Sequence, residues 1–168
     1  FVAYIATIAV PWQAYMLPQF IMMRSMGLYD TLLAMIVLQA FSAFGVFLMR
    51  QFYQGIPTEL CEAARIDGLS EYGIWAKIML PLSTAAIATL VIFTFVGTWN
   101  DYMGPMIYLT HDENKTIQVG LRRFIQEYTS DYHLIMAASL VSLLPVSVVF
   151  LCLQKYFIEG IATSGLKG

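Results

Sequence analysis

Residues 57–81 read PTELCEAARIDGLSEYGIWAKIMLP, the longest polar stretch in a chain that is otherwise mostly apolar. Its local signals predict two short helices. Thr58 is a candidate N-cap of the first helix, and Gly68 can close that helix, because glycine accepts the left-handed conformation found after many helix ends. Ser70 can cap a second helix, which Pro81 terminates or redirects. The stretch therefore predicts two helices joined at a glycine corner, a form that suits a docking surface.

The composition around this stretch is that of a membrane protein. Of the 168 residues, 59% are hydrophobic and 12% are charged, and the mean hydropathy is +0.69. A soluble domain carries about 25% charged residues. The net charge of −2 is too small to indicate a nucleic-acid partner. The two cysteines, Cys61 and Cys152, lack metal-type spacing and are expected to be free thiols.

Four stretches lack Asp, Glu, Lys and Arg over about the 20 residues that a helix needs to cross a bilayer. Their apolar residues run continuously rather than alternating, so helices are expected instead of barrel strands. The sequence thus predicts an all-α polytopic membrane bundle, a single domain over residues 1–168. The expected spans cover residues 1–23, 31–49, 78–100 and 132–154.

Polar segments connect these spans. A loop at residues 50–81 and a tail at residues 155–168 lie on one side of the membrane, and a loop at residues 108–131 lies on the other. Lys and Arg are spread almost evenly over the two sides, so charge alone does not orient the chain.

Polar residues within the spans are the candidates for lining a substrate path. Aromatic rings, amides and a carboxylate suit sugars, since rings meet C–H faces and polar groups meet hydroxyls. Interfacial anchoring, capping of a helix break and bonds between helices are the competing interpretations. The candidate path residues are Trp99, Asn100, Asp101, Tyr102, Gln13 and Gln39.

Catalytic chemistry finds no support in the sequence. There is no G-x-x-x-x-G-K-[ST] loop to cradle ATP phosphates. His111 and His133 lack the neighbouring ligands of a metal site, and no serine sits in a nucleophile turn. The chain is therefore expected to be no enzyme and to hold no cofactor.

Three motifs resemble one known family. Glu62-Ala63-Ala64, followed by Asp67-Gly68 and Pro81-Leu82, resembles the EAA loop of bacterial ABC-importer permease subunits. Two further segments are similar to those of maltose-transporter-type sugar permeases: Trp99-Asn100-Asp101-Tyr102 with Pro105, and Thr116-Ile117-Gln118-Val119-Gly120-Leu121. The resemblance covers essentially the whole chain, although such subunits normally have six spans. Because the chain begins Phe-Val-Ala, we expect it to be an N-terminally truncated piece.

The resemblance implies a sugar importer in a bacterial cell membrane, driven by separate ATPase subunits. The loop at residues 50–81 (the coupling loop) and the tail are then cytoplasmic, and residues 108–131 are extracytoplasmic. The implied partners are two ATPase subunits, a second permease subunit, an extracytoplasmic substrate-binding protein and membrane lipid. The implied ATPase-coupling residues are Glu62, Ala63, Ala64, Asp67, Gly68 and Pro81. Candidate docking residues for the binding protein are Arg122, Arg123 and Glu127, for which a plain solvated loop is the alternative.

Three alternatives remain at this point. The chain could belong to an ABC permease for another solute, or to an ion-coupled secondary transporter. An ion-coupled carrier would be expected to hold ionisable residues deep in its spans, and almost none are present. A truncated chain could also be inactive, because alternating access needs the missing helices.

Overall fold

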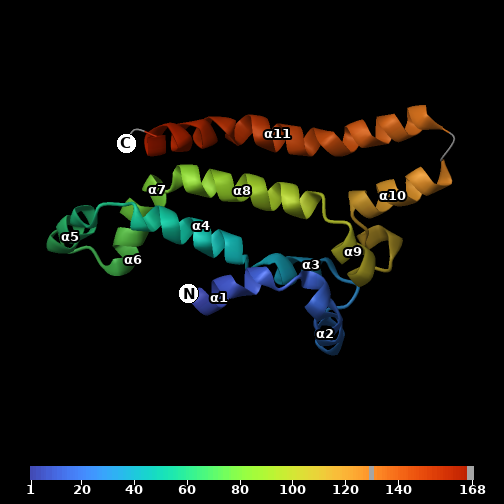
Figure 1. The fold of residues 1–168 in the computed structure, drawn as a ribbon, viewed down its shortest axis with the longest axis horizontal. Coiled ribbons are helices and arrows are strands. Elements are labelled where there is room, and N and C mark those ends of the chain that lie inside the picture. Colours follow the sequence, from blue (N-terminus) through green and yellow to red (C-terminus); the bar gives the residue numbers. More distant parts are fainter. Residues whose placement is uncertain (129–130, 166–168) are drawn as a thin grey trace. The chain divides into compact units, whose positions relative to one another are not determined.

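The structure is a computed structural model that describes residues 1–128 and 131–165, without the side chains of residue 126 and residues 157–165. Within this part every regular element is a helix and no strand is found (Figure 1). The all-α prediction is therefore confirmed. In chain order the elements are α1 (Val2–Ala6), η1 (Thr7–Ala9), α2 (Trp12–Ser25), α3 (Leu32–Gln39), α4 (Ala43–Gln54), α5 (Thr58–Ile66), α6 (Glu71–Ile74), the π-helical η2 (Trp75–Met79), α7 (Leu80–Leu82), α8 (Thr84–Trp99), α9 (Met103–Tyr108), η3 (Asp112–Asn114), α10 (Ile117–Glu127) and α11 (Tyr132–Gly165).

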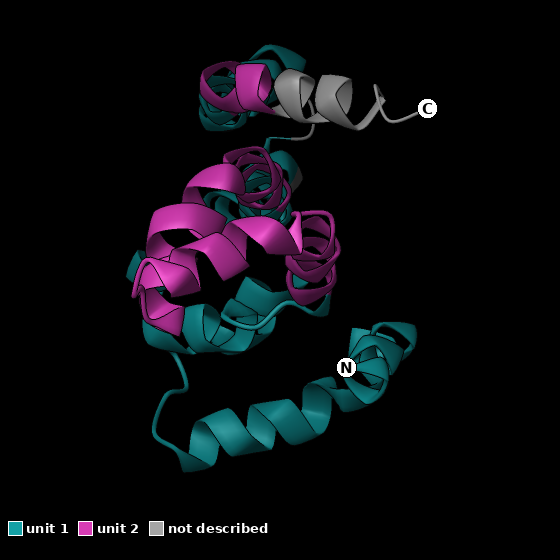
Figure 2. Ribbon diagram, turned by 90° about the vertical axis from the view of Figure 1, so that its left-hand side faces the viewer, with its two compact units in different colours: residues 1–43, 94–149 teal, residues 44–93, 150–168 magenta. Residues whose placement is uncertain are grey.

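The helices group into two compact units, coloured separately in Figure 2. Unit 1 comprises residues 1–43 and 94–149, and unit 2 comprises residues 44–93 and 150–168. Each unit combines chain segments that lie far apart in the sequence.

The spans differ in how continuous their helices are. Among the described helices, only α11 is by itself long and apolar enough to cross a membrane, over Tyr132–Tyr156 with a mean hydropathy of 2.5. The second and third expected spans are bent pairs, α3 with α4 and Glu71–Leu82 with α8, which raise the number to three if each pair is one span. The number of spans stays a prediction.

The first expected span is not one helix. Pro11 lies between η1 and α2 with an extended backbone, at φ −63° and ψ 138°. Proline has no N–H to continue a helical ladder, which explains the break. The 14 residues of α2 reach only about 21 Å at 1.5 Å per residue, less than the bilayer core. Pro18, by contrast, is accommodated inside α2.

The core of unit 1 joins α2, α3 and α9. Met23, Ala34 and Tyr108 are each at most 1% exposed and form one cluster. A glycine turn supports this core, because Gly27 adopts φ +69° after α2 and leads into Leu28, which packs against the cluster.

Unit 2 contains the predicted two-helix coupling loop. Gly68 adopts φ +82°, and its N–H donates to Arg65 O at 3.0 Å while Leu69 N donates to Ala64 O at 3.0 Å. These two bonds satisfy carbonyls that the end of α5 would otherwise leave unpaired. The Ser70 hydroxyl accepts the N–H of Gly73 at 3.2 Å and caps α6 as predicted.

Two details of this loop differ from the sequence analysis. Thr58 is the first helical residue of α5 and not its N-cap, because Pro57 takes the extended N-cap position and no side chain caps this end. The second is an ion pair that the local signals did not indicate: Arg65 bonds Glu71 through two contacts of 2.7 and 3.2 Å. The glycine corner brings α6 within reach, and Glu71 then offers a carboxylate in bidentate geometry.

Pro81 redirects the chain as expected. Pro81 follows η2, a π-helical turn with a wider coil than an α-helix. This wider turn lies next to the position where proline lacks an N–H to donate. The chain then bends by 74° between Glu71–Leu82 and α8. Ser83, fully buried at this bend, donates its hydroxyl to Met79 O at 2.5 Å.

The tail expected at residues 155–168 is in large part helical, since α11 continues through Gly165. Cys61 and Cys152 are free thiols, as predicted.

We predict that Ser70→Ala loosens α6 without disturbing α2. Losing an N-cap costs about 1 kcal/mol, which raises local opening about fivefold. Hydrogen exchange at residues 71–74 should accelerate correspondingly. Ser25→Ala is the control, because Ser25 bonds a carbonyl in its own last turn and caps no helix. Unchanged exchange at residues 71–74 in Ser70→Ala would contradict the capping role.

Candidate functional site

A carboxylate organises the break between α8 and α9 in unit 1. Asp101 Oδ1 accepts the N–H of Gly104 at 3.2 Å, and its Oδ2 accepts the Nε2 of Gln39 at 3.1 Å. The Oε1 of Gln39 in turn accepts the Thr98 hydroxyl at 2.5 Å. This network ties α3 to the start of α9 and satisfies a backbone donor where the helix is interrupted. Two predicted path residues are thereby brought together.

Gly104 is required for this close approach. A Cβ at this position would lie 2.6 Å from Asp101 Oδ2 and 3.2 Å from Met35 Cε. A larger residue would therefore push the carboxylate away from Gln39.

A pocket of about 310 Å³ opens beside this network. A second polar network lines it, in which the Oε1 of Gln19 accepts both the Trp12 Nε1–H at 2.9 Å and the Tyr108 hydroxyl at 3.1 Å. The lining residues are Trp12, Tyr15, Gln19, Met35, Leu38, Gln39, Asp101, Met103, Gly104 and Tyr108. Rings, amides and one carboxylate thus share a single concave surface, the mixture that suits a sugar.

The other predicted path residues lie outside this pocket. Gln13 is exposed on α2. Trp99 donates its indole N–H to Ser142 O of α11 at 3.0 Å, and Asn100 accepts from Gln118 at 3.4 Å. Sequence reasoning missed Trp12, Gln19 and Tyr108, because only the fold brings α9 against α2.

A second carboxylate clamps the turn before α3 to the loop after α9. Asp30 Oδ1 accepts the backbone N–H groups of Thr110 at 2.7 Å and His111 at 3.1 Å, and its Oδ2 bonds the ring Nδ1 of His111. The Asp30 carbonyl accepts from Asn114 at 2.9 Å. Asp30 is held at φ +61°, a left-handed conformation that aspartate tolerates better than most residues.

This clamp shifts the proton affinities of both partners. Partial desolvation opposes ionisation of Asp30, but the hydrogen bonds from His111 and from the Thr110 and His111 backbones outweigh it and hold the pKa of Asp30 well below its ordinary value. The hydrogen bond and the charge of Asp30 raise the pKa of His111.

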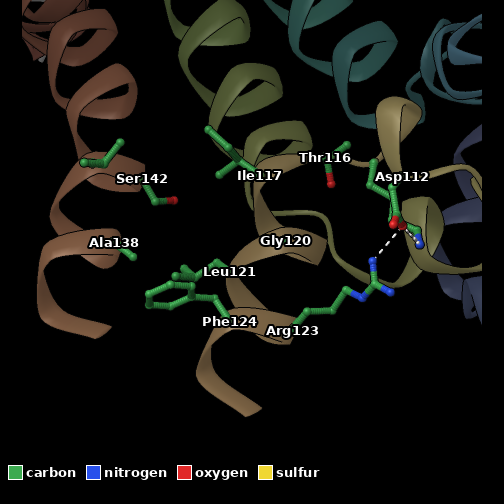
Figure 3. Close-up of a pocket in the computed structure, with 11 residues that line it drawn as sticks. Asp112, Thr116, Ile117, Gly120, Leu121, Arg123, Phe124, Ala138 and Ser142 are labelled. Carbon is green, nitrogen blue, oxygen red and sulfur yellow. Dashed lines mark hydrogen bonds and ion pairs between the residues drawn. The ribbon is translucent and has the colours of Figure 1, made fainter. Parts of the chain in front are cut away.

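Helix α10 lies beside α11 across a pocket of about 500 Å³, drawn in Figure 3. Asp112 bridges the loop to this helix, since its Oδ1 lies 2.6 Å from both Lys115 Nζ and Arg123 Nη1. The hydroxyl of Thr116 is buried beside this pocket without a hydrogen-bond partner in the described residues. Of the residues predicted to dock a binding protein, Arg123 is therefore engaged within the chain.

The coupling loop presents an apolar surface to its surroundings. Ile66 and Tyr72 are each 86% exposed, and Trp75 is 48% exposed. Glu62 and Ala63 are also exposed, whereas Ala64 is buried within unit 2 at 4% exposure. Successive helical residues are about 100° apart, so adjacent alanines face different ways. Sequence reasoning did not single out Ile66, Tyr72 or Trp75.

The whole chain was compared with known protein families. The family described as binding-protein-dependent transport system inner membrane component matches residues 1–163. The chain belongs to this family.

Relatives within the family include sugar permeases. The chain is 34% identical to the arabinooligosaccharides transport system permease protein AraQ of Halalkalibacterium halodurans over 168 residues, which are 100% of this chain and 60% of AraQ. It is 36% identical to the polygalacturonan/rhamnogalacturonan transport system permease protein YtcP of Bacillus subtilis, with 91% of this chain and 59% of YtcP covered. The chain thus spans about three fifths of the length of these relatives.

A solved structure shares the fold. It is a bacterial ABC transporter involved in the import of the acidic polysaccharide alginate, with a TM-score of 0.75 and 30% identity. The match covers 84% of this chain and 55% of that one.

We predict that Asp101→Asn weakens the α3–α9 connection. The amide's NH₂ would face either Gly104 N–H or Gln39 Nε2, leaving a donor opposite a donor, at a cost of about 1–3 kcal/mol. The thermal midpoint of the chain in detergent should fall. Asp67→Asn, at an exposed carboxylate of the coupling loop, is the matched control and should not change it. An equal midpoint in both variants would contradict the role given to Asp101.

We predict a pH optimum for the Asp30 clamp. Because the pKa of Asp30 is lowered, its stabilisation is present above the unfolded value of about 4 and is lost as the pH falls. Because the pKa of His111 is raised, its contribution is present below about 6.5 and is lost as the pH rises through the folded value. Thermal midpoints should therefore be highest between about pH 4 and 6.5.

His111→Asn should remove the decline on the alkaline side of this optimum. His133→Asn, at a histidine without a side-chain hydrogen bond in the described residues, should retain the decline. If both variants showed the same dependence of the thermal midpoint on pH, the Asp30–His111 clamp could not be the cause of the alkaline decline.

Proposed function

We propose that the chain is a permease subunit of an ATP-driven importer for sugars or oligosaccharides, acting in a bacterial cell membrane. Separate subunits hydrolyse ATP, a second permease subunit completes the path, and a binding protein delivers the cargo. The observation that carries the proposal is the coupling loop, where a glycine-cornered pair of helices exposes apolar side chains next to apolar spans in a member of a binding-protein-dependent family.

The exposed surface of the coupling loop has the chemistry of a protein contact. Tyrosine and tryptophan are enriched among the residues that supply most of the energy at such contacts, and Tyr72 and Trp75 are exposed here together with Ile66. Exposed Glu62 and Ala63 flank this surface, with Glu62 offering a charge and Ala63 allowing close approach. Asp67 and Gly68 form the corner and Pro81 the joint to α8. Motion of docked ATPase subunits then reaches the spans directly, as a rigid-body change.

The substrate path is proposed to include the Gln39–Asp101 network and the pocket beside it. Trp99, Asn100 and Tyr102 stand at the same end of α8 and are proposed to continue that surface. The few polar side chains of this network are hydrogen-bonded to one another, and these bonds fix their positions before a sugar binds.

The side of the chain that carries residues 108–131 is proposed to receive the binding protein. Arg122, Arg123 and Glu127 are all exposed on α10, and Arg123 pairs with Asp112. The coupling loop and the end of the chain are proposed to lie on the opposite, cytoplasmic side.

The cargoes named for the relatives divide by charge. Arabino-oligosaccharides are neutral, whereas polygalacturonan and alginate carry a carboxylate on each sugar unit. Both neutral and acidic sugars are thus represented among the relatives, so family membership does not distinguish between these two classes of cargo for this chain.

We predict that Gly68→Val uncouples ATP hydrolysis from transport. A β-branched residue at φ +82° strains the corner by about 1–2 kcal/mol or more, so the docking helices shift. In the full-length chain, assembled with its partner subunits, sugar uptake should fall about tenfold while membrane insertion is retained. Ala76→Val, an exposed helical position of the same loop, is the control and should transport normally. Normal uptake by Gly68→Val would overturn the coupling role.

A further inference from the structure

Two adjacent arginines of α10 differ in their surroundings. Arg123 Nη1 lies 2.6 Å from Asp112 Oδ1, so its charge is balanced within the chain. The guanidinium of Arg122 makes no ion pair and no hydrogen bond with the residues that the structure describes. A guanidinium stays charged at every physiological pH and presents five N–H donors. Arg122 is therefore a cation available to a ligand.

Arg122 borders a hollow of about 500 Å³, shared with Tyr102, Gln118, Leu121 and Ile125. The hollow is shallow and open on one side. The other four residues are partly buried, and no acidic side chain lines the hollow among the residues that the structure describes. The hollow therefore has one net positive charge, an aromatic ring and an amide.

The amide of Gln118 is fixed in place. Its Nε2 donates to Ser142 Oγ at 3.2 Å and to Asn100 Oδ1 at 3.4 Å. Asn100 belongs to the segment at the end of α8 that is proposed for the substrate path. The hollow therefore adjoins that segment, since Tyr102 lines the hollow and Asn100 bonds Gln118.

These groups match a sugar that carries a carboxylate. An arginine holds a carboxylate through two parallel N–H···O bonds, the Tyr102 ring offers an apolar face, and hydroxyl and amide groups can bond sugar hydroxyls. A neutral sugar would cover the guanidinium without balancing its charge, which costs affinity.

We propose that this hollow binds the carboxylate of a uronic-acid unit through Arg122, and that the transporter carries acidic oligosaccharides. The inference rests on the proposed sugar import and selects its substrate class. In this proposal Arg122 binds the sugar cargo and does not dock the binding protein, and experiments can separate these two roles.

The test measures direct binding to the full transporter, with the full-length chain and its partner subunits in nanodiscs and no binding protein. The probes are labelled galacturonate and mannuronate trisaccharides, each compared with its carboxyl-reduced neutral counterpart. At least one acidic probe should bind about tenfold or more tightly than its counterpart, as expected for charge-assisted hydrogen bonds. Arg122→Gln should abolish this preference, Arg122→Lys should retain part of it, and Arg123→Gln should retain it in full.

Equal binding of every acidic probe and its reduced counterpart would overturn the proposal. An unchanged preference for acidic probes in Arg122→Gln would also overturn the proposal. If, in addition, the binding protein no longer stimulated the ATPase activity of that variant, Arg122 would be a docking residue for the binding protein. Failure of the proposed function gives a different result in a separate assay. Wild-type transporter in sealed proteoliposomes, supplied with its binding protein, would then show no ATP-dependent uptake of acidic or neutral sugars.

Discussion

Backbone hydrogen bonding in an apolar surrounding is the constraint on which this structure depends. Each interruption of a helix exposes N–H and C=O groups that lipid cannot satisfy, so a break persists only where other groups bond them. Asp101 does so between α8 and α9. In the polar coupling loop, the Gly68 corner likewise bonds the last carbonyls of α5 before the chain turns into α6. The candidate substrate site and the candidate docking surface are both built at such breaks.

The two breaks serve different purposes. At the Asp101 break, polar groups of three helices converge on a concave surface, and their mutual bonds hold them in position. At the Gly68 corner the polar backbone is satisfied locally, while Ile66 and Tyr72 are left exposed at a cost that a protein partner would offset. One break therefore suits a ligand of modest size and the other a larger protein surface.

Much of this architecture could be predicted from the sequence because the signals are local. Glycine and serine identified the corner and cap of the coupling loop, and continuous apolar runs identified an all-helical chain. Thr58 was misassigned because proline and threonine compete for the same end of α5, and the Arg65–Glu71 pair forms only after the corner brings two helices together. Residues such as Gln19 and Tyr108 are 89 positions apart, and no local period predicts that they share a hydrogen bond.

The central claim is that the coupling loop transmits the action of an ATPase to the spans. Oxidative crosslinking between a cysteine at position 63 and a cysteine introduced on the ATPase subunit tests it most directly, in the full-length assembled complex with Cys61 and Cys152 replaced by serine. Ala63 is exposed on α5, and Ala64 beside it is buried, so cysteine at position 64 provides the reference. We expect position 63 to form a crosslink to an ATPase subunit whose yield changes with ATP. Absence of that crosslink from an intact, transport-competent complex would contradict it.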